Sequence, residues 1–351
     1  MEASRVHFLL RMGKEVSRLK IHVLMPDDGV REGFLPPANR KLLESVGETR
    51  WNTSRGQMAG EELKDALRSA DVLVTGWGCP RVTADLLGDG KHASLLVHTG
   101  GTVAPFVDSG AMGGGLRVVS ANELYAKSVA EGTAAYILAA LRNIPYWDRE
   151  VRAGRWRGNA FENRGLFGKK VGLTGFGAVA RHLLPLLKAF DTEIMVCSGH
   201  LSPEKCEAAG MKKAGLEEIF STCDVVSIHN SLTEATRHLI GGSLLSLLKP
   251  GAVLVNTSRG AVIDQQALTE ELKKGRFTAL LDVFETEPLE VGSPLRALNN
   301  VILVPHMAGP TSDLYETIGR EMIREIRNYR DGKPLRYEIS VSEVGHMTAK
   351  G

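Results

Sequence analysis

Three side chains with complementary chemistry each follow a short apolar run in the second half of the chain. They are Arg259 in NTSRGAVID, Glu287 in LDVFETEPLE and His306 in VILVPHMAG. The apolar runs are typical of parallel strands, and in an open parallel sheet ligands bind beyond the carboxyl ends of the strands. We therefore expect the guanidinium, the carboxylate and the imidazole to converge at one edge of a sheet.

This combination suits the reduction of a 2-oxo acid by hydride transfer. Arg259 can bind a carboxylate through two charge-assisted hydrogen bonds, or polarise the 2-oxo group. His306 can donate a proton to the carbonyl oxygen and take it back in the reverse direction. Glu287, if it bonds the imidazole, favours the charged form of His306 and fixes its tautomer. Taken singly, each residue has a structural alternative, because strand-end histidines often only pack and most arginines and glutamates lie on surfaces.

A glycine-rich turn precedes these residues in KKVGLTGFGAVARHLLPLLKAF (169–190). The segment reads as strand, tight turn and helix, in which Gly175 permits the turn and Gly177 lets the backbone approach a pyrophosphate. Alanine is an accepted variant at the third small position, Ala180. Small-residue turns are common in α/β proteins, but the strand–turn–helix context here favours a dinucleotide site. Pro185 falls inside the predicted helix and is expected to kink it.

The strand predicted next, EIMVCSGH (193–200), lacks the acidic residue that usually selects the dinucleotide. A carboxylate at this position bonds the ribose 2′-hydroxyl and repels a 2′-phosphate. Ser198 stands there, followed by Gly199 and His200. Because a serine accepts either group, the sequence leaves NAD and NADP equally open as cofactors.

Short apolar runs alternate with amphipathic stretches along the chain, which is typical of α/β proteins with parallel sheets. The first set, five strands with four crossovers, predicts a flavodoxin-like sheet. Its strands are expected near 20–25, 48–51, 71–76, 94–98 and 117–120, with a helix over 60–70. The second set has nearly continuous apolar strands, as expected where both faces of a sheet are covered. They are expected near 169–175, 193–198, 224–229, 252–257, 277–283 and 301–304.

Helical patterns over 124–144 and 312–332 flank the second set. The first is rich in small and apolar residues and is expected to pack on a sheet, or also against a second subunit. No third sheet is available for the last helix, so the tail is expected to return to the first domain. The predicted domains are residues 1–121 with 310–351, which bind substrate, and residues 122–309, which bind the dinucleotide. A hinge and a ligand-binding cleft between them would follow.

Longer stretches around the three polar residues resemble the D-isomer-specific 2-hydroxyacid dehydrogenase family. The likeness covers about 94–332 and is carried by HNSLTEATRHLIGGSLLSLLKPGAVLVNTSRGAVID, LDVFETEPLE and VPHMAG. The resemblance implies a flavodoxin-like substrate-binding domain, an inserted Rossmann domain and a homodimer built on the helix over 124–144. It also implies reversible, NAD(P)-dependent reduction of a small 2-oxo acid to its D-2-hydroxy acid, with Arg259, Glu287 and His306 as the catalytic triad.

The same resemblance assigns substrate and cofactor contacts. VHTGGTVAPF (97–106) matches a loop whose backbone amides hold the substrate carboxylate, so Gly100 and Gly101 are the candidates, with an ordinary glycine turn as the alternative. Asp282 matches an aspartate that contacts the nicotinamide amide, and Thr257 matches a backbone cofactor contact. The other cofactor contacts implied by the match are Gly175, Phe176, Gly177, Ala178, Val179, Ser198, His229, Asn230, Ser231, Thr236, Ser258, Arg259, His306 and Ala308.

The chain departs from the family pattern at two positions. Many members have an aspartate where Ser198 stands and a proline where Ser231 stands. Residues 198–200 are closer to the serine/threonine-x-arginine pattern of members that prefer NADP, although His200 replaces the arginine. The departures leave the choice of cofactor open and do not affect the reaction class.

Composition argues against several classes of partner and site. The 351 residues are enough for two domains, and 43 Lys and Arg against 41 Asp and Glu give a net charge of +2. This near-neutral balance gives no reason to expect a nucleic-acid or membrane partner. The sequence also has no run of about 18 apolar residues, the length that a membrane-spanning helix needs. Cys79, Cys197, Cys206 and Cys223 have neither C-x-x-C spacing nor a metal-type pairing with histidine. We expect a cytoplasmic protein with reduced thiols and no metal.

Two alternative functions stay open on the same fold. Corepressors of the C-terminal-binding-protein type sense dinucleotides with similar residues, and formate or phosphite dehydrogenases use a related fold on other substrates. Two segments have no assigned chemistry. We interpret residues 1–19 as an extension of unknown purpose ahead of the first strand, because their apolar patch is too short for the core of a secretory signal. The basic stretch 149–170 is interpreted as a solvated connector, with attraction of phosphate-bearing ligands as the alternative.

Overall fold

The computed structural model describes residues 18–88, 90, 92–158, 163–345 and 347. The chain divides into two compact units. The first unit comprises the described residues up to Ala121 together with Asp313–Gly345, and the second comprises Asn122–Ser312. Most of the predicted N-terminal extension and part of the predicted basic connector, residues 159–162, lie outside the described residues.

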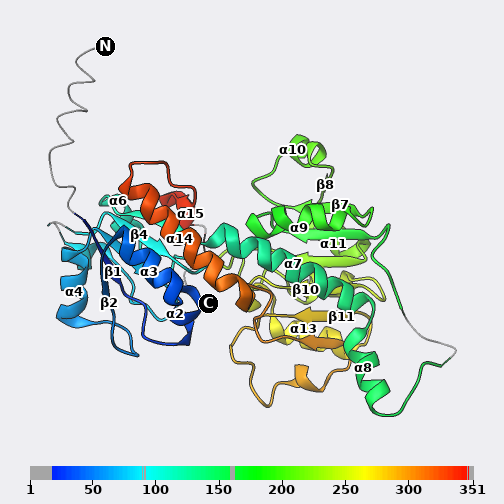
Figure 1. The fold of residues 1–351 in the computed structure, drawn as a ribbon. Coiled ribbons are helices and arrows are strands. Elements are labelled where there is room, and N and C mark those ends of the chain that lie inside the picture. Colours follow the sequence, from blue (N-terminus) through cyan, green and yellow to red (C-terminus); the bar gives the residue numbers. More distant parts are fainter. Residues whose placement is uncertain (1–17, 89, 91, 159–162, 346, 348–351) are drawn as a thin grey trace. The chain divides into compact units, whose positions relative to one another are not determined.

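The first unit is built on a six-stranded sheet with the order β13-β5-β4-β3-β1-β2 (Figure 1). Its strands are β1 (Leu19–Val23), β2 (Gly47–Trp51), β3 (Val72–Thr75), β4 (Leu95–His98), β5 (Arg117–Ser120) and β13 (Glu338–Ile339). Strands β1 to β5 pair in parallel in the order 2-1-3-4-5, which confirms the predicted flavodoxin-like sheet. The sequence did not predict β13, an antiparallel edge strand, because two residues are too short for a periodic signal.

Helices cover the first sheet, and one of them comes from the end of the chain. They are α2 (Gly29–Phe34), α3 (Pro37–Val46), α4 (Gly60–Ser69), α5 (Ala84–Leu87), α6 (Ser109–Gly113), α14 (Tyr315–Arg330) and α15 (Val341–Gly345). Helix α14 packs tightly on α2, because a Cβ atom at Gly319 would lie 1.8 Å from the carbonyl oxygen of Phe34. The Asn39 amide donates to the carbonyls of Phe34 and Glu316, each at 2.8 Å. These contacts fix the C-terminal helix within the first unit.

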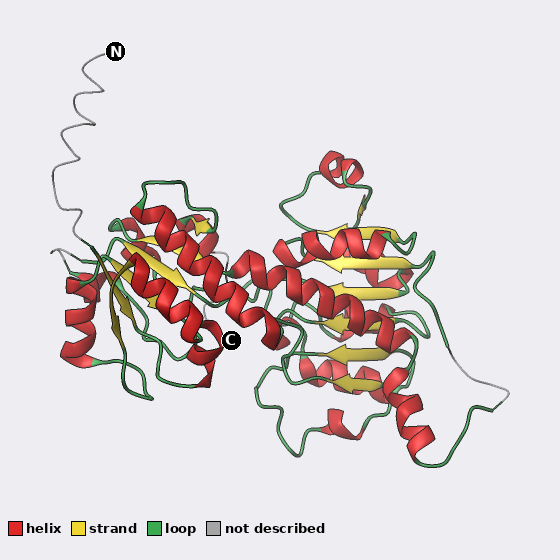
Figure 2. Ribbon diagram, in the orientation of Figure 1, coloured by secondary structure: helices red, strands yellow, loops and turns green. Residues whose placement is uncertain are grey.

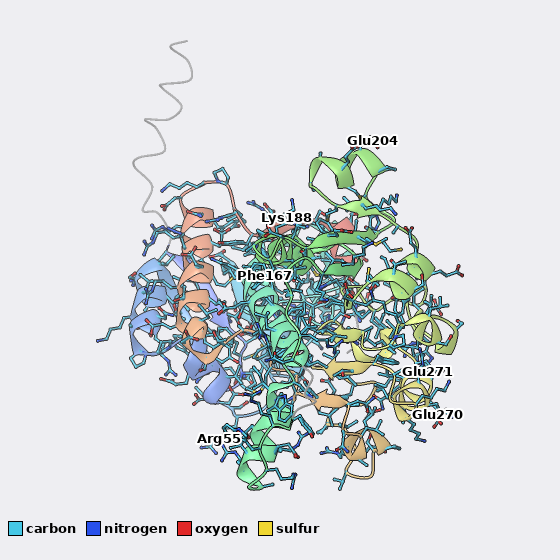
Figure 3. The ribbon with its side chains drawn as sticks, turned by 90° about the vertical axis from the view of Figure 1, so that its right-hand side faces the viewer. Arg55, Phe167, Lys188, Glu204, Glu270 and Glu271 are labelled. Carbon is cyan, nitrogen blue, oxygen red and sulfur yellow. The ribbon has the colours of Figure 1, made fainter. Side chains whose placement is uncertain are left out.

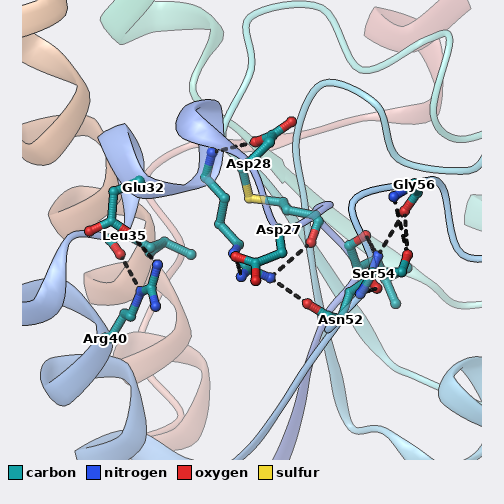
Figure 4. Close-up of polar contacts among 11 residues, drawn as sticks. Asp27, Asp28, Glu32, Leu35, Arg40, Asn52, Ser54 and Gly56 are labelled. Carbon is teal, nitrogen blue, oxygen red and sulfur yellow. Dashed lines mark hydrogen bonds and ion pairs between the residues drawn. The ribbon is translucent and has the colours of Figure 1, made fainter.

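A buried arginine, Arg31, links the carboxyl end of β1 to that of β2. Two of its partners, Asp27 and Asn52, are labelled in Figure 4. Arg31 donates to the carbonyl oxygens of Met25 at 3.3 Å and Asn52 at 2.5 Å, and forms an ion pair with Asp27. Asp28 caps α2 by accepting a hydrogen bond from the Arg31 amide at 3.0 Å. The two terminal nitrogens of the guanidinium therefore hold the loops at this edge of the first sheet, whereas its buried Nε has no hydrogen-bond partner among the described residues.

The second unit is built on a seven-stranded parallel sheet with the order β12-β11-β10-β9-β6-β7-β8. Figure 2 shows strands of this sheet, in yellow, side by side with helices next to them. Its strands are β6 (Lys170–Thr174), β7 (Glu193–Cys197), β8 (Lys212–Lys213), β9 (Val225–Ile228), β10 (Val253–Asn256), β11 (Thr278–Leu281) and β12 (Val301–Leu303). Counted within the unit, the strands follow the order of a dinucleotide-binding sheet, which confirms the predicted Rossmann fold. Strand β8 was missed because its two lysines give no apolar signal.

Alternating strand residues fill two buried clusters in the second unit. Val253 and Val255 pack in one cluster with α7 and α9, whereas Leu254 packs in the other, as the two-residue period of a strand requires. The helices are α7 (Asn122–Leu141), α8 (Ile144–Arg152), α9 (Ala178–Lys188), α10 (Pro203–Ala208), α11 (Leu216–Thr222), α12 (Gly242–Leu247) and α13 (Gln265–Lys273). Their outer faces carry exposed charged side chains such as Lys188 and Glu204 (Figure 3).

The predicted single helix over 124–144 is wrong at its C-terminal end. Helix α7 ends at Leu141, Asn143 adopts a left-handed conformation with φ of 53°, and α8 begins at Ile144. Pro145 explains the break, because proline is tolerated in the first turn of a helix but not in its interior. Helix α9 nevertheless continues through Pro185. No helix in the described ranges combines the length and apolar character needed to cross a membrane.

Candidate active site

The imidazole and the carboxylate predicted to act together are in direct contact. Nδ1 of His306 lies 2.8 Å from Oε2 of Glu287, and the other carboxylate oxygen accepts from the Phe284 amide at 3.0 Å. A carboxylate only accepts, so Nδ1 carries the proton and Nε2 remains to exchange a proton with a ligand. The side chains are 49% and 37% exposed. The pair is thus both oriented and accessible.

The backbone at His306 is held in an uncommon conformation. Its φ of 54° lies in the left-handed region, which costs a non-glycine residue about 1–2 kcal/mol. The His306 amide donates to the carbonyl oxygen of Asp282 at 2.8 Å, which ties the loop after β12 to the end of β11. The contact with Glu287 is thus made from a backbone conformation that the surrounding structure maintains.

Asp282 supports the loop that carries His306. Its carboxylate is buried and accepts from the amides of Met307 at 2.7 Å and Ala308 at 3.0 Å, while the Tyr136 hydroxyl lies 3.4 Å away. Burial raises the pKa of Asp282, and the two amide hydrogen bonds oppose that rise. These contacts give Asp282 a positioning role, and its predicted contact with nicotinamide stays a prediction.

Arg259 is presented by a short structured loop after β10. The Asn256 side chain accepts from the Ser258 amide at 3.0 Å and donates to the Arg259 carbonyl at 3.0 Å. Gly260 must be glycine, because a Cβ atom there would lie 1.9 Å from the carbonyl carbon of Phe284. This close approach brings the arginine loop against the loop that carries Glu287.

The guanidinium of Arg259 is half-buried and donates to the Ser258 carbonyl at 2.6 Å. Burial lowers the pKa of Arg259, and the nearby charge of Glu287 opposes that effect. The structure therefore brings Arg259, Glu287 and His306 together at the carboxyl ends of β10, β11 and β12. This is the arrangement expected from the three separate sequence positions.

A cavity of about 610 Å³ opens beside the imidazole–carboxylate pair. Apolar side chains form most of its wall, and Glu287, His306 and Arg296 supply polar groups. The residues that line it are Phe284, Glu287, Pro288, Leu289, Arg296, Leu303, Val304, Pro305 and His306. A small organic molecule would therefore find both apolar surface and a proton-exchanging group in the second unit alone.

The glycine turn after β6 has the geometry of an anion site. Gly175 has φ of 82°, and a Cβ atom there would lie 2.8 Å from the carbonyl carbon of His229, so only glycine fits. Gly177 caps α9 without a side-chain hydrogen bond and has no atom within 4 Å of its Cβ direction. Ala180 is fully buried where the helix meets the sheet. The open first turn of α9 leaves backbone amides for a phosphate.

Ser198, the predicted cofactor selector, lies next to this turn. The amide of Gly175 donates to the carbonyl of Cys197 at 2.8 Å, which places the end of β7 against the turn. The half-buried Ser198 hydroxyl accepts from the His200 amide at 3.4 Å. No carboxylate follows β7 before residue 204, so the strand end lacks the group that would exclude a 2′-phosphate.

Two further predicted contacts flank the turn from the end of β9. The His229 amide donates to the Thr174 carbonyl at 2.7 Å, and its Nε2 lies 2.9 Å from the Ser227 hydroxyl. Burial lowers the pKa of His229 to about 4, so its imidazole is neutral at neutral pH. Within the described part of the chain, the side-chain oxygen of Asn230 is buried without a hydrogen-bonding partner. A buried polar atom of this kind fits a site that a ligand completes.

The remaining predicted cofactor residues lie on the same edge of the second sheet. The Thr257 hydroxyl lies 2.9 Å from that of Thr133 on α7, and the Thr236 hydroxyl donates to the Ser231 carbonyl at 2.6 Å. Phe176, Ala178 and Val179 are half-buried residues of the turn and the first turn of α9, and Ala308 is buried beside Asp282.

Gly100 and Gly101 belong to the first unit and follow β4. The Ser120 hydroxyl contacts the carbonyls of Gly101 at 2.6 Å and Gly100 at 3.3 Å. Among the described residues, neither glycine amide donates a hydrogen bond to another group. Because Ser120 holds the carbonyls of Gly100 and Gly101 and their amides make no hydrogen bond to other described residues, these amides are suited to bind an anion such as a carboxylate.

Sequence reasoning did not single out Asn256 or Gly260. Both act through backbone contacts, and only the glycine directly after Arg259 could have signalled one of them. The four cysteines are free thiols, and three are buried. In the described ranges, no group of three or more His, Cys, Asp or Glu side chains is placed to hold a metal ion.

Comparisons with known proteins identify the family of the second unit and of the chain. The NAD-binding domain of D-isomer-specific 2-hydroxyacid dehydrogenases matches residues 134–308. The chain is 34% identical over 306 residues to D-3-phosphoglycerate dehydrogenase of Methanocaldococcus jannaschii, covering 87% of this chain and 56% of that protein. It therefore spans only about half the length of that relative.

Two other relatives match over nearly their full length. The chain is 31% identical to hydroxypyruvate reductase of Thermotoga maritima, covering 89% of this chain and 98% of that protein. The crystal structure of a glyoxylate reductase from Paecilomyes thermophila superposes with a TM-score of 0.75 at 23% identity, covering 93% of this chain and 99% of that one. The second likeness supports the fold alone.

Proposed function

The chain belongs to the D-isomer-specific 2-hydroxyacid dehydrogenase family, and on this premise we propose that it interconverts a small 2-oxo acid and its D-2-hydroxy acid. The observation that carries the proposal is the 2.8 Å contact between His306 and Glu287, next to Arg259. An oriented acid–base pair beside a cation is what carbonyl reduction of an anionic substrate needs.

In the proposed reaction His306 moves a proton at Nε2. In the direction of reduction, the imidazolium donates to the developing alkoxide oxygen, and in the direction of oxidation the neutral ring accepts from the hydroxyl group. Glu287 stabilises the imidazolium and keeps the ring oriented through Nδ1. Arg259 binds the substrate carboxylate or the carbonyl oxygen, where its partial burial strengthens the interaction.

Residues around the glycine turn would hold the dinucleotide. Gly175 and Gly177 would form the phosphate site, Ser198 would contact the ribose, and the Asn230 side-chain oxygen, which has no partner among the described residues, would accept from a donor on the cofactor. When bound in its reduced form, the nicotinamide supplies the hydride. We assign cofactor use to NAD or NADP, since no acidic residue at the end of β7 excludes the 2′-phosphate.

We propose that Gly100 and Gly101 hold the substrate carboxylate through their unbonded amides.

We also propose a homodimer that uses the region of α7 and α8. Helix α8 has no buried residue, and Ile144 and Val151 are each more than half exposed, which is surface that a second subunit could cover.

Replacing Glu287 by glutamine is expected to lower kcat for reduction by about tenfold or more. The carboxylate holds the His306 ring through Nδ1 and stabilises the imidazolium that donates the proton, and a neutral amide replaces that charge only in part. The measurement is the steady-state rate of cofactor oxidation at saturating 2-oxo acid. The matched control is Glu285→Gln, because Glu285 also lies 2.8 Å from a histidine, His238. A kcat within about twofold of the unaltered chain for Glu287→Gln would remove Glu287 from the mechanism.

Replacing Ser198 by aspartate is expected to weaken NADPH selectively. A carboxylate there repels the 2′-phosphate, so KM for NADPH should rise about tenfold or more while KM for NADH stays within about threefold. Ser202→Asp is the matched control, because Ser202 caps α10 through its hydroxyl and aspartate preserves a cap while adding the same charge. Equal weakening of both cofactors would show that Ser198 is not the selector.

A further inference from the structure

His98 is a buried imidazole to which the proposed reaction gives no role. It is the last residue of β4 and is fully buried, two residues before Gly100. Its ring packs against that of Phe106 with centroids 4.5 Å apart. Burial lowers the pKa of His98 to about 3, so the ring is neutral throughout the physiological range. A buried neutral imidazole has two distinct nitrogens, one donor and one acceptor.

The two ring nitrogens of His98 face different elements. Nδ1 lies 3.0 Å from the hydroxyl of Thr75, the last residue of β3. Nε2 points toward the glycine loop, because a Cβ atom at Gly100 would lie 2.5 Å from it. Among the described residues Nε2 has no hydrogen bond of good geometry, although the Thr102 backbone is near enough to raise the His98 pKa against the effect of burial.

The Thr75 hydroxyl can donate to Nδ1 or accept from it, so it anchors the ring of His98 in either neutral tautomer. With Nδ1 anchored on β3, Nε2 is the nitrogen that remains to interact with the glycine loop.

The loop that His98 faces is packed closely on its other sides. A Cβ atom at Gly76 would lie 2.7 Å from the Thr99 hydroxyl, and the Thr99 amide donates to the Thr75 carbonyl at 2.9 Å. Ser120 holds the carbonyls of Gly100 and Gly101. Nε2 of His98 therefore adds a further contact with this loop, at Gly100.

We propose that His98 is a positioning residue for the substrate: its buried ring, with Nε2 against Gly100, braces the Gly100–Thr102 loop so that the glycine amides present themselves to a carboxylate. The inference rests on the proposed function, because it assumes that the loop binds the carboxylate of a 2-oxo acid. It assigns to His98 an effect on substrate binding and none on proton transfer.

Two substitutions at His98 separate the roles of the ring nitrogens. In His98→Gln the amide nitrogen stands as many bonds from Cβ as Nε2, whereas in His98→Asn it corresponds to Nδ1. We expect KM for the 2-oxo acid to rise about tenfold in His98→Asn, the equivalent of about 1.4 kcal/mol, and less than about threefold in His98→Gln. In both variants kcat and the Kd for the reduced dinucleotide should stay within about twofold, since neither depends on this loop.

A second variant and a control complete the test. Thr75→Val keeps the packing but removes the hydroxyl that anchors Nδ1 of His98, so it should raise KM by less than His98→Asn does. His22→Gln is the matched control, because His22 is another buried histidine of the same sheet and should leave KM unchanged. Thermal unfolding of each variant reports its folded fraction.

Several outcomes would overturn the inference. A KM that is retained in His98→Asn but raised in His98→Gln would show that only the Thr75 contact matters. If kcat and the folded fraction fell equally in the His98 variants while KM stayed the same, His98 would have a purely structural role. An unchanged KM in both His98→Asn and His98→Gln would likewise rule out an effect on substrate binding. Absence of turnover by the unaltered chain would instead contradict the proposed function.

Discussion

Replacing His306 by asparagine is expected to lower kcat for reduction of a 2-oxo acid by about 10²–10⁴-fold, the range that general acid–base catalysis contributes. Asparagine can keep a hydrogen bond toward Glu287, but it cannot carry the transferable proton that Nε2 supplies. Because the loss falls on proton transfer, the Kd for the reduced dinucleotide should change by less than about threefold. Stopped-flow or steady-state oxidation of the reduced cofactor measures the effect.

The second unit offers a matched control for His306. His238 also has a left-handed backbone, with φ of 51°, and its Nε2 lies 2.8 Å from Glu285. It is therefore an imidazole–carboxylate pair of the same kind in the same unit, but outside the predicted catalytic set. His238→Asn should leave kcat within about twofold of the unaltered chain. Equal losses in the two variants would mean that His306 contributes only to structure.

Replacing Arg259 by lysine is expected to lower kcat/KM for the 2-oxo acid by about 10²-fold. A lysine keeps the charge but loses the planar, two-pronged contact, and each hydrogen bond to a charged group contributes about 1.5–3 kcal/mol. Most of the loss should appear in KM if Arg259 binds the substrate carboxylate, and in kcat if it polarises the carbonyl group. The split between the two parameters therefore assigns the role.

A structural arginine in the same unit provides the comparison. Arg276 donates to the carbonyl of Leu248 at 2.7 Å and pairs with Glu271 at 3.2 Å, so Arg276→Lys should alter stability more than kcat/KM. Asn256 and Gly260 hold the loop of Arg259 through the backbone, so Arg259→Lys should fold normally. A kcat/KM within about threefold of the unaltered chain would place Arg259 outside substrate binding.

The strands and the convergence of the three polar residues could be predicted from the sequence for one physical reason. Strands buried on both faces appear as apolar runs, and the parallel order places every carboxyl end at the same edge. Arg259, Glu287 and His306 each follow such a run, and the 2.8 Å contact between His306 and Glu287 satisfies the predicted pairing. Their chemical roles still await the experiments above.

The features that could not be predicted from the sequence depend on contacts between segments that are distant in the chain. The need for glycine at 260 comes from the backbone of Phe284, and the buried setting of Asp282 comes from the amides after His306. The two-residue strands β8 and β13 are recognised only through their partners. The environment of His98 likewise requires Thr75 and Gly100, which no local pattern connects.

The most direct measurement is oxidation of NADH and of NADPH by the unaltered chain with glyoxylate, hydroxypyruvate, pyruvate and longer 2-oxo acids, followed by chiral analysis of the product. We expect turnover with at least one of these acids and, where the product is chiral, formation of the D-2-hydroxy acid. Tight dinucleotide binding without turnover of any acid would contradict the enzyme assignment and favour a dinucleotide-sensing protein. Formation of the L-2-hydroxy acid would contradict the proposed stereochemistry.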